Sequence, residues 1–237
     1  MNLKKCKTFV KTRIPFVHSF YLETLDVFHS RVFTNIYRNN GWRYTSGAGS
    51  SLAETENVRR DIAALIAELR PRSILDIPCG NHLWMSHVDM KECRYIGADI
   101  VRDLVLRDRS QYTEPNKEFV ILDITRSPLP AVDLIICRDC LVHLSERLIR
   151  KALNNVKKSR STYLLTTTFQ EREMNEDIKT GGWRPLNLQI SPFNFPEPIL
   201  LTREGCTEAA GAYKDKSLGL WRVDDIPQLG AVSDAAA

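Results

Sequence analysis

The stretch Ser73–Leu83, with the sequence SILDIPCGNHL, constrains the fold of this chain more than any other. Aliphatic side chains surround one acid, Asp76, and the turn-forming residues Pro78 and Gly80 follow at once. A short apolar run that ends in turn residues is typical of a strand buried in a parallel sheet. Ligands of open α/β sheets bind just beyond the carboxyl ends of such strands. The stretch therefore predicts both a buried strand and the edge of a binding site.

The residues after this stretch alternate between strand-like and helix-like patterns. Alternation of this kind favours a parallel sheet with right-handed crossover connections. A helix is expected over Leu144–Val156, and a second one from the Ser51–Glu54 capping-box pattern to about Leu69, where Pro71 ends it. The expected strands are Ser73–Ile77, Arg94–Ala98, Phe119–Leu122, Val132–Cys137, Thr162–Thr168, Ile199–Thr202 and Leu218–Val223.

The chain divides into two parts on composition and pattern. Residues 1–70 form the expected helical cap, with an amphipathic segment over 16–38 and a loop rich in Gly and Ser over 46–51. The amphipathic segment covers the core or the site, although its basic start keeps a membrane-surface helix open. Residues 71–237 form the expected core, interrupted at about 170–198 by an irregular insert. Long inserts of this kind are usually functional or disordered, and the aromatic content favours function.

Bulk properties exclude several classes of protein. The chain has 237 residues, 43% of them hydrophobic, and a net charge of +4, which gives no strong signal for nucleic-acid binding. No apolar run reaches the roughly 20 residues of a membrane span, and the basic N-terminus lacks the apolar stretch of a signal peptide, so a cytoplasmic protein is expected. The lone pair Cys137 and Cys140 lacks the second pair that structural zinc sites use, and we expect no metal. Oligomerisation is left open.

The residues of this first strand and turn resemble a known family. The order of apolar residues, acid, Cys79 and Gly80 is similar to motif I of the class I S-adenosylmethionine (SAM) methyltransferases, and the PCG-x-x-x-WM pattern that ends in Trp84 and Met85 resembles a narrower group within them. The resemblance implies a three-layer α/β sandwich with a Rossmann-like, seven-stranded and mostly parallel sheet whose last strand is antiparallel. It also implies SAM as the cofactor. The rival cofactor, NAD, would require more glycines than this turn has.

Candidate cofactor-binding residues follow three of the expected strands. Gly80 allows close approach of backbone to ligand, and Asp99, which ends the second strand roughly 20 residues after Asp76, suits ribose hydroxyls. Asp123 follows the third strand, where the resemblance implies a contact to adenine. Each acid has an alternative role as a helix cap or turn former. The full expected set is Asp76, Pro78, Cys79, Gly80, Asp99, Ile100, Asp123, Ile124 and Arg138.

Candidate catalytic residues follow the fourth strand, namely Arg138, Asp139 and His143. If a helix begins near Asp139, then Asp139 and His143 share one face of it, and the acid would orient the ring and raise its basicity. The pair would then accept a proton from a hydroxyl group. The alternative is that Asp139 caps a helix and His143 packs against the cofactor. Arg138 would bind the substrate or pair with Asp139.

Candidate substrate residues lie in the insert. Trp183, Arg184 and Asn187 combine a flat apolar face with hydrogen-bond donors, which suits a sugar, although the same residues could fix the loop to the core. The expected function is therefore SAM-dependent O-methylation of a sugar or another polar small molecule. The alternatives are a non-catalytic subunit with the same fold and a methyltransferase that acts on protein or nucleic acid.

Overall fold

The computed structural model describes residues 30–41 and 47–230. Its centre is a seven-stranded sheet with the order β3-β2-β1-β4-β5-β7-β6. Strands β1 to β5 are parallel to one another, and β7 runs antiparallel to both β5 and β6. The predicted antiparallel last strand is confirmed. The strands are β1 (Ser73–Asp76), β2 (Arg94–Asp99), β3 (Lys117–Ile121), β4 (Leu134–Cys137), β5 (Tyr163–Phe169), β6 (Leu200–Arg203) and β7 (Lys216–Arg222).

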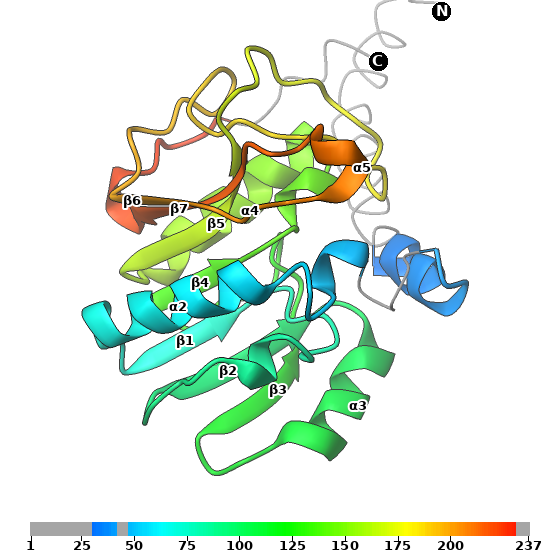
Figure 1. The fold of residues 1–237 in the computed structure, drawn as a ribbon, viewed down its shortest axis with the longest axis vertical. Coiled ribbons are helices and arrows are strands. Elements are labelled where there is room, and N and C mark those ends of the chain that lie inside the picture. Colours follow the sequence, from blue (N-terminus) through cyan, green and yellow to red (C-terminus); the bar gives the residue numbers. More distant parts are fainter. Residues whose placement is uncertain (1–29, 42–46, 231–237) are drawn as a thin grey trace, which may run out of the picture.

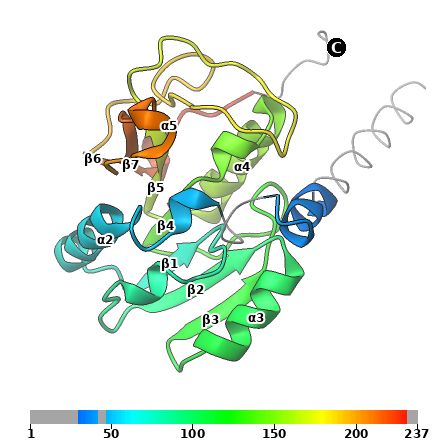
Figure 2. The same cartoon turned by 45° about the vertical axis from the view of Figure 1, so that its right-hand side comes forward.

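Helices cover both faces of this sheet, which gives the three-layer sandwich (Figure 1). Helix α2 (Glu56–Leu69) buries Ile62 and Ile66 against one face, where they join Ile74 of β1. Helix α4 (Glu146–Ser159) buries its apolar side on the other face, where it joins Leu75. Neighbouring residues of β1 thus contribute to different cores, because successive side chains of a strand point to opposite faces. Helix α3 (Arg102–Tyr112) packs beside β3, as Figure 2 shows from a second side.

The start of α2 differs from the sequence-based expectation. Residues 48–50 form a 3-10 turn, residues 52–55 are turns, and the helix begins only at Glu56. Half of the predicted capping box is present, since the Glu54 N–H donates to the Ser51 Oγ at 3.2 Å. The Glu54 carboxylate does not return to Ser51; it accepts hydrogen bonds from the N–H and hydroxyl of Thr207. A distant tertiary contact has replaced the local one.

The insert between β5 and β6 contains no helix or strand, as predicted, but it is held firmly to the core. Its Leu186, Leu188, Phe193 and Phe195 are buried in the same cluster as α4. Asp177 also accepts a hydrogen bond from the N–H of Glu146 at 2.6 Å and so caps the first turn of α4. The insert is therefore part of the folded domain.

Part of the predicted N-terminal cap is described. Residues 30–38 are helical, and a side chain on Gly181, whose φ is +95°, would approach Val32 of this helix to 2.5 Å. The helix therefore packs directly on the insert. The rest of the expected amphipathic segment, residues 16–29, lies outside the described residues, as does Ser46 of the Gly/Ser loop. Within the described ranges, no helix is both long and apolar enough to cross a bilayer.

Candidate functional site

A cavity of about 400 Å³ lies at the carboxyl ends of the parallel strands. Loops after β1, β2 and β3 line one end of it, which we call the nucleoside end, with the following residues: Pro78, Cys79, Gly80, Asp99, Ile100, Leu122, Asp123, Ile124 and Thr125. Loops after β4, β5 and β6 line the other end, which we call the acceptor end, together with the start of β7. Its residues are Arg138, Asp139, His143, Phe169, Trp183, Cys206, Glu208, Tyr213 and Lys216. Ligands bind at this edge in open α/β sheets.

Asp99 holds the nucleoside end together. Its Oδ2 accepts the Gly80 N–H at 3.1 Å and its Oδ1 accepts the Val101 N–H at 2.8 Å, so one carboxylate joins the loops after β1 and β2. Gly80 has a φ of +57°, in the left-handed region that favours glycine. Burial raises the pKa of Asp99 to about 6, although both backbone hydrogen bonds oppose this shift.

Asp76, the most prominent acid of the sequence motif, does not line this cavity. It is 1% exposed and accepts the Tyr95 hydroxyl at 2.6 Å, and Tyr95 Oη in turn lies 3.1 Å from His82 Nδ1. Burial raises the pKa of Asp76 to about 7. The acid is therefore linked through Tyr95 to His82 of the loop after β1, whereas we had expected it to contact the ligand.

Asp123 both lines the cavity and forms a turn. Its Oδ1 accepts the Thr125 N–H at 2.9 Å and the Thr125 hydroxyl at 2.7 Å. This is the turn-forming role that was left open for it from the sequence. Ile100 and Ile124 lie at the same end, as expected.

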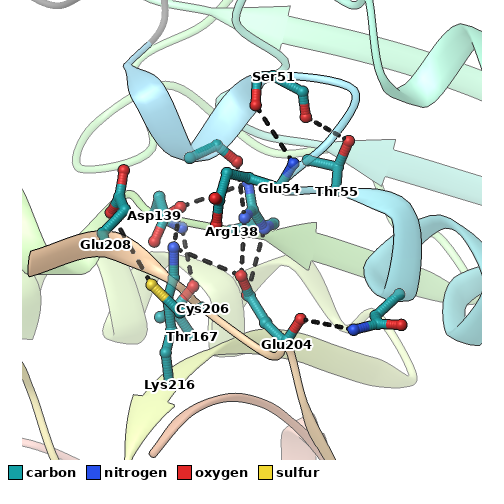
Figure 3. Close-up of polar contacts among 12 residues, drawn as sticks. Ser51, Glu54, Thr55, Arg138, Asp139, Thr167, Glu204, Cys206, Glu208 and Lys216 are labelled. Atoms are coloured by element: carbon teal, nitrogen blue, oxygen red, sulfur yellow. Dashed lines mark hydrogen bonds and ion pairs between the residues drawn. The ribbon is translucent and has the colours of Figure 1, made fainter. Parts of the chain in front are cut away.

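A buried network of charges lies beneath the acceptor end (Figure 3). Arg138 donates two hydrogen bonds to Glu204, from Nε at 3.2 Å and from Nη2 at 2.7 Å, and a third to the Gly49 carbonyl at 3.0 Å. Both partners of the ion pair are almost fully buried, with 4% and 3% of their side chains exposed. Lys216 Nζ lies 2.7 Å from Asp139 Oδ2 and 3.4 Å from Glu204 Oε2. Two cations thus neutralise two carboxylates.

Asp139 is held in an unusual conformation by this network. Its φ is +52°, its N–H donates to the Thr167 hydroxyl at 2.8 Å, and its Oδ2 also lies 3.3 Å from Arg138 Nη1. Burial opposes ionisation, but Lys216 and Arg138 outweigh it and hold the pKa of Asp139 well below its usual range. Its other oxygen, Oδ1, is buried and has no hydrogen-bond partner in the described structure. A buried unpaired carboxylate oxygen marks a position for a donor from a ligand.

His143 faces the cavity but is not arranged as the sequence suggested. Residues Leu141–His143 form a 3-10 turn, and Asp139 precedes it in a left-handed conformation, so the expectation that Asp139 and His143 share a helical face is wrong. The ring is held instead by Gly182, whose carbonyl lies 2.8 Å from Nδ1. A carbonyl only accepts, so Nδ1 carries the proton and Nε2 is the lone-pair nitrogen of the neutral ring. Burial lowers the pKa of His143, which keeps this neutral form dominant.

Three aromatic rings form the far wall of the acceptor end, and we call them the aromatic wall: Phe169, Trp183 and Tyr213. The rings of Trp183 and Tyr213 meet edge to face with centroids 4.6 Å apart, and Phe169 lies 6.0 Å from Trp183 and 6.2 Å from Tyr213. Trp183, a predicted substrate residue, is 39% exposed and lines the cavity.

The other two predicted substrate residues, Arg184 and Asn187, do not line the cavity. Arg184 is buried and donates to the carbonyls of Leu141 and Leu144, both at 2.9 Å. Asn187 is buried as well, and its side-chain amide donates to the carbonyls of Gln170 and Arg172. Both residues satisfy backbone groups that an irregular segment would otherwise leave unpaired. Arg184 thus fixes the insert to the loop after β4, which is the alternative that the sequence left open, and Asn187 joins two parts of the insert to each other.

Four residues of the site were not expected from the sequence, namely Glu204, Glu208, Tyr213 and Lys216. Lys216 carried a weak signal, because a lysine at the start of a strand with six buried residues needs a partner. The others precede that strand in segments with no pattern of their own. Among the described residues, no group of three or more His, Cys, Asp or Glu side chains is placed to hold a metal ion.

Comparison with known proteins agrees with this geometry. Residues 74–160, from β1 to the end of α4, match the family model described as a methyltransferase domain. Human N-acetylserotonin methyltransferase, solved with SAM, is 16% identical with a TM-score of 0.55; the match covers 85% of this chain and 61% of that one. The 1,6-didemethyltoxoflavin-N1-methyltransferase of Burkholderia thailandensis is also 16% identical, with a TM-score of 0.59 and coverage of 85% and 89%.

The chain thus spans less than two thirds of the human enzyme, and no curated protein matches it in sequence. The strand order, the position of the cavity and the matched domain nevertheless agree with one another. Residues 74–160 therefore match a methyltransferase domain, and the chain shares its fold with two solved methyltransferases.

Proposed function

We propose that this protein transfers a methyl group from SAM to a hydroxyl of a polar small molecule such as a sugar, with His143 as the general base. The observation that carries the proposal is the hydrogen bond between His143 Nδ1 and the Gly182 carbonyl, which makes Nε2 the basic nitrogen of a ring that lines the cavity. A neutral imidazole in this position can accept the hydroxyl proton, and help of this kind is typically worth about 10² to 10⁴ in rate.

The residues present fit the proposed cofactor. SAM carries adenine, a ribose diol and a charged amino-acid tail, and when bound it supplies an activated methyl group on its sulfonium. Asp99, Ile100 and Ile124 suit the nucleoside, and Asp123 would lie near the base. The unpaired Oδ1 of Asp139 suits the ammonium of the tail. Pro78, Cys79 and Gly80 supply the loop between these groups.

The geometry gives Asp139 and Arg138 supporting roles in the reaction. Asp139 stays ionised beside two cations, so it is unsuited to accept a proton at neutral pH. Arg138 is saturated by Glu204, Gly49 and Asp139, so it is better suited to hold the loop after β4 than to bind substrate directly. His143 is then the group that moves a proton.

A small acceptor is supported by the way the cavity is covered. Gly49 and Phe33 line it from the N-terminal side and Trp183 from the insert. The apolar C–H face of a sugar ring would pack against the aromatic wall, because aromatic side chains offer a large apolar surface. A macromolecular acceptor would need an open approach that these segments restrict.

The test begins with binding of S-adenosylhomocysteine (SAH) by calorimetry, using the full chain and Asp99→Ala. Micromolar binding that the variant loses is expected, because Asp99 also joins the two loops of the nucleoside end. Transfer of a labelled methyl group to a panel of monosaccharides and polyols then tests the acceptor. A folded protein that binds neither SAM nor SAH would contradict the proposal.

A further inference from the structure

One carboxylate at the acceptor end has no countercharge. Glu208 lines the cavity, yet it forms no ion pair with any residue that the structure describes. Among the described residues, its carboxylate accepts a hydrogen bond from the thiol of Cys206, which lies 3.9 Å from Oε2. Arg138 and Lys216 form their ion pairs with Glu204 and Asp139, and neither forms one with Glu208.

Glu208 lies close to the charge network without joining it (Figure 3). A Cβ on Gly49 would be 3.8 Å from Glu208 Oε1, 3.6 Å from Asp139 Oδ2 and 3.4 Å from Lys216 Nζ. The three charged groups therefore face the same point of the loop. With two cations against Asp139, Glu204 and Glu208, the acceptor end has an excess of one negative charge.

The aromatic wall extends from the same segment of chain. Tyr213 follows Glu208 by five positions, lines the same cavity and meets the rings of Trp183 and Phe169. Aromatic faces attract cations as well as flat rings. One unpaired carboxylate beside an aromatic wall suits a ligand that has both a ring and a positive charge.

We infer that the acceptor is a ring-bearing molecule with a protonated amine, whose ring lies against the aromatic wall and whose ammonium pairs with Glu208. This inference rests on the proposed function and narrows its acceptor. Two kinds of molecule share the chemistry: an amino sugar and an aromatic amine that carries a hydroxyl.

The experiment compares two matched pairs of probes on the full chain saturated with SAH. Glucosamine is paired with glucose, and tyramine with 4-ethylphenol, so each pair differs chiefly in the amine. Binding is measured by calorimetry at about pH 6.5, where both amines are protonated. The pair that responds identifies which kind of acceptor the cavity takes.

The amine member of at least one pair should bind about tenfold more tightly than its neutral partner, the usual value of a hydrogen bond to a charged group. Glu208→Gln should abolish that preference and change SAH affinity by less than about twofold. Glu68→Gln, an exposed acid on α2 that does not line the cavity, is the matched control and should keep the preference.

The ring contact is tested separately. Tyr213→Leu should weaken the preferred amine and its neutral partner alike, whereas Tyr213→Phe should keep both. Equal binding within both pairs, with SAH bound normally, would overturn the inference and leave the methyltransferase function intact. A loss of SAH affinity in Glu208→Gln would assign the carboxylate to the cofactor and also overturn it. Failure of SAH to bind to the unaltered chain would instead contradict the proposed function.

Discussion

Two pairs of carboxylates, of which all but Asp139 are almost fully buried, support the two ends of the cavity, and the two pairs are stabilised in different ways. Asp76 and Asp99, at the nucleoside end, accept hydrogen bonds from neutral groups, and burial raises their pKa values to about 7 and about 6. Asp139 and Glu204, at the acceptor end, are paired with Arg138 and Lys216. The first pair can take up protons near neutral pH, whereas Asp139 stays charged. One end of the site is therefore sensitive to pH and the other is held by ion pairs.

The largest expected effect is on the chemical step at the acceptor end. His143→Gln should lower kcat by about 10² to 10⁴ without changing SAH affinity, because glutamine cannot accept the proton. The pKa of His143 is lowered by burial, so kcat/KM should fall only below the usual range of histidine, and this acidic limb should vanish in the variant. Rate measurements from about pH 5 to 8 check both points. An unchanged kcat would assign His143 to packing.

The next effect concerns the ion pairs. Glu204→Gln should lower the free energy of unfolding by about 3–5 kcal/mol, because the buried Arg138 loses the carboxylate to which it donates two hydrogen bonds. Glu118→Gln is the control, since its pair with Arg94 is exposed and should contribute less than about 1 kcal/mol. Urea denaturation measures both values. Equal losses in the two variants would show that the buried ion pair of Glu204 stabilises the fold no more than an exposed one does.

Asp76 has no cationic partner, so replacing it should stabilise the fold at higher pH, whereas replacing Glu204 should destabilise it. The raised pKa of Asp76 means that its contribution to stability is complete below about pH 4 and is lost as the pH rises through about 7. Asp76→Asn avoids this loss. The free energy of unfolding of the variant, relative to that of the unaltered chain, should therefore rise by about 1–3 kcal/mol between pH 5 and pH 8. Denaturation curves at the two pH values test this, with Glu68→Gln at an exposed position as the control. A difference that does not change with pH would show that Asp76 is ionised throughout.

The smallest effect is expected at Asp123. Asparagine keeps the Oδ1 that accepts from Thr125, so Asp123→Asn should preserve the turn and weaken SAH binding by only about threefold. Asp99→Ala should cost far more. A large loss in Asp123→Asn that matches Asp99→Ala would mean that the nucleoside end depends on both acids equally.

The sequence predicted the nucleoside end better than the acceptor end, for a physical reason. Gly80, Asp99 and Asp123 follow strands directly, so parallel pairing alone brings them to one edge. Among the three acids expected there, only Asp76 does not line the cavity. The side chain of the last residue of a strand can point into the core as easily as toward the ligand-binding edge.

The acceptor end depends on contacts between residues distant in the chain. Arg138 and Glu204 are 66 positions apart, and Asp139 and Lys216 are 77 apart. Contacts between residues so far apart leave no periodic pattern in the sequence, so Glu204, Glu208 and Tyr213 could not be predicted from it. Arg184 and Asn187 had the right composition for a substrate site, but the unpaired carbonyls of an irregular segment compete for the same donors.

The hydrogen bonds of the insert set a limit on how this enzyme could be given a new acceptor. Asp177 caps α4, Arg184 binds two carbonyls of the loop after β4, and the Gly182 carbonyl orients His143. Grafting a foreign loop in place of the whole insert would therefore damage a helix and the proposed base together. Directed evolution of specificity should keep these anchors and vary Trp183, whose side chain faces the cavity.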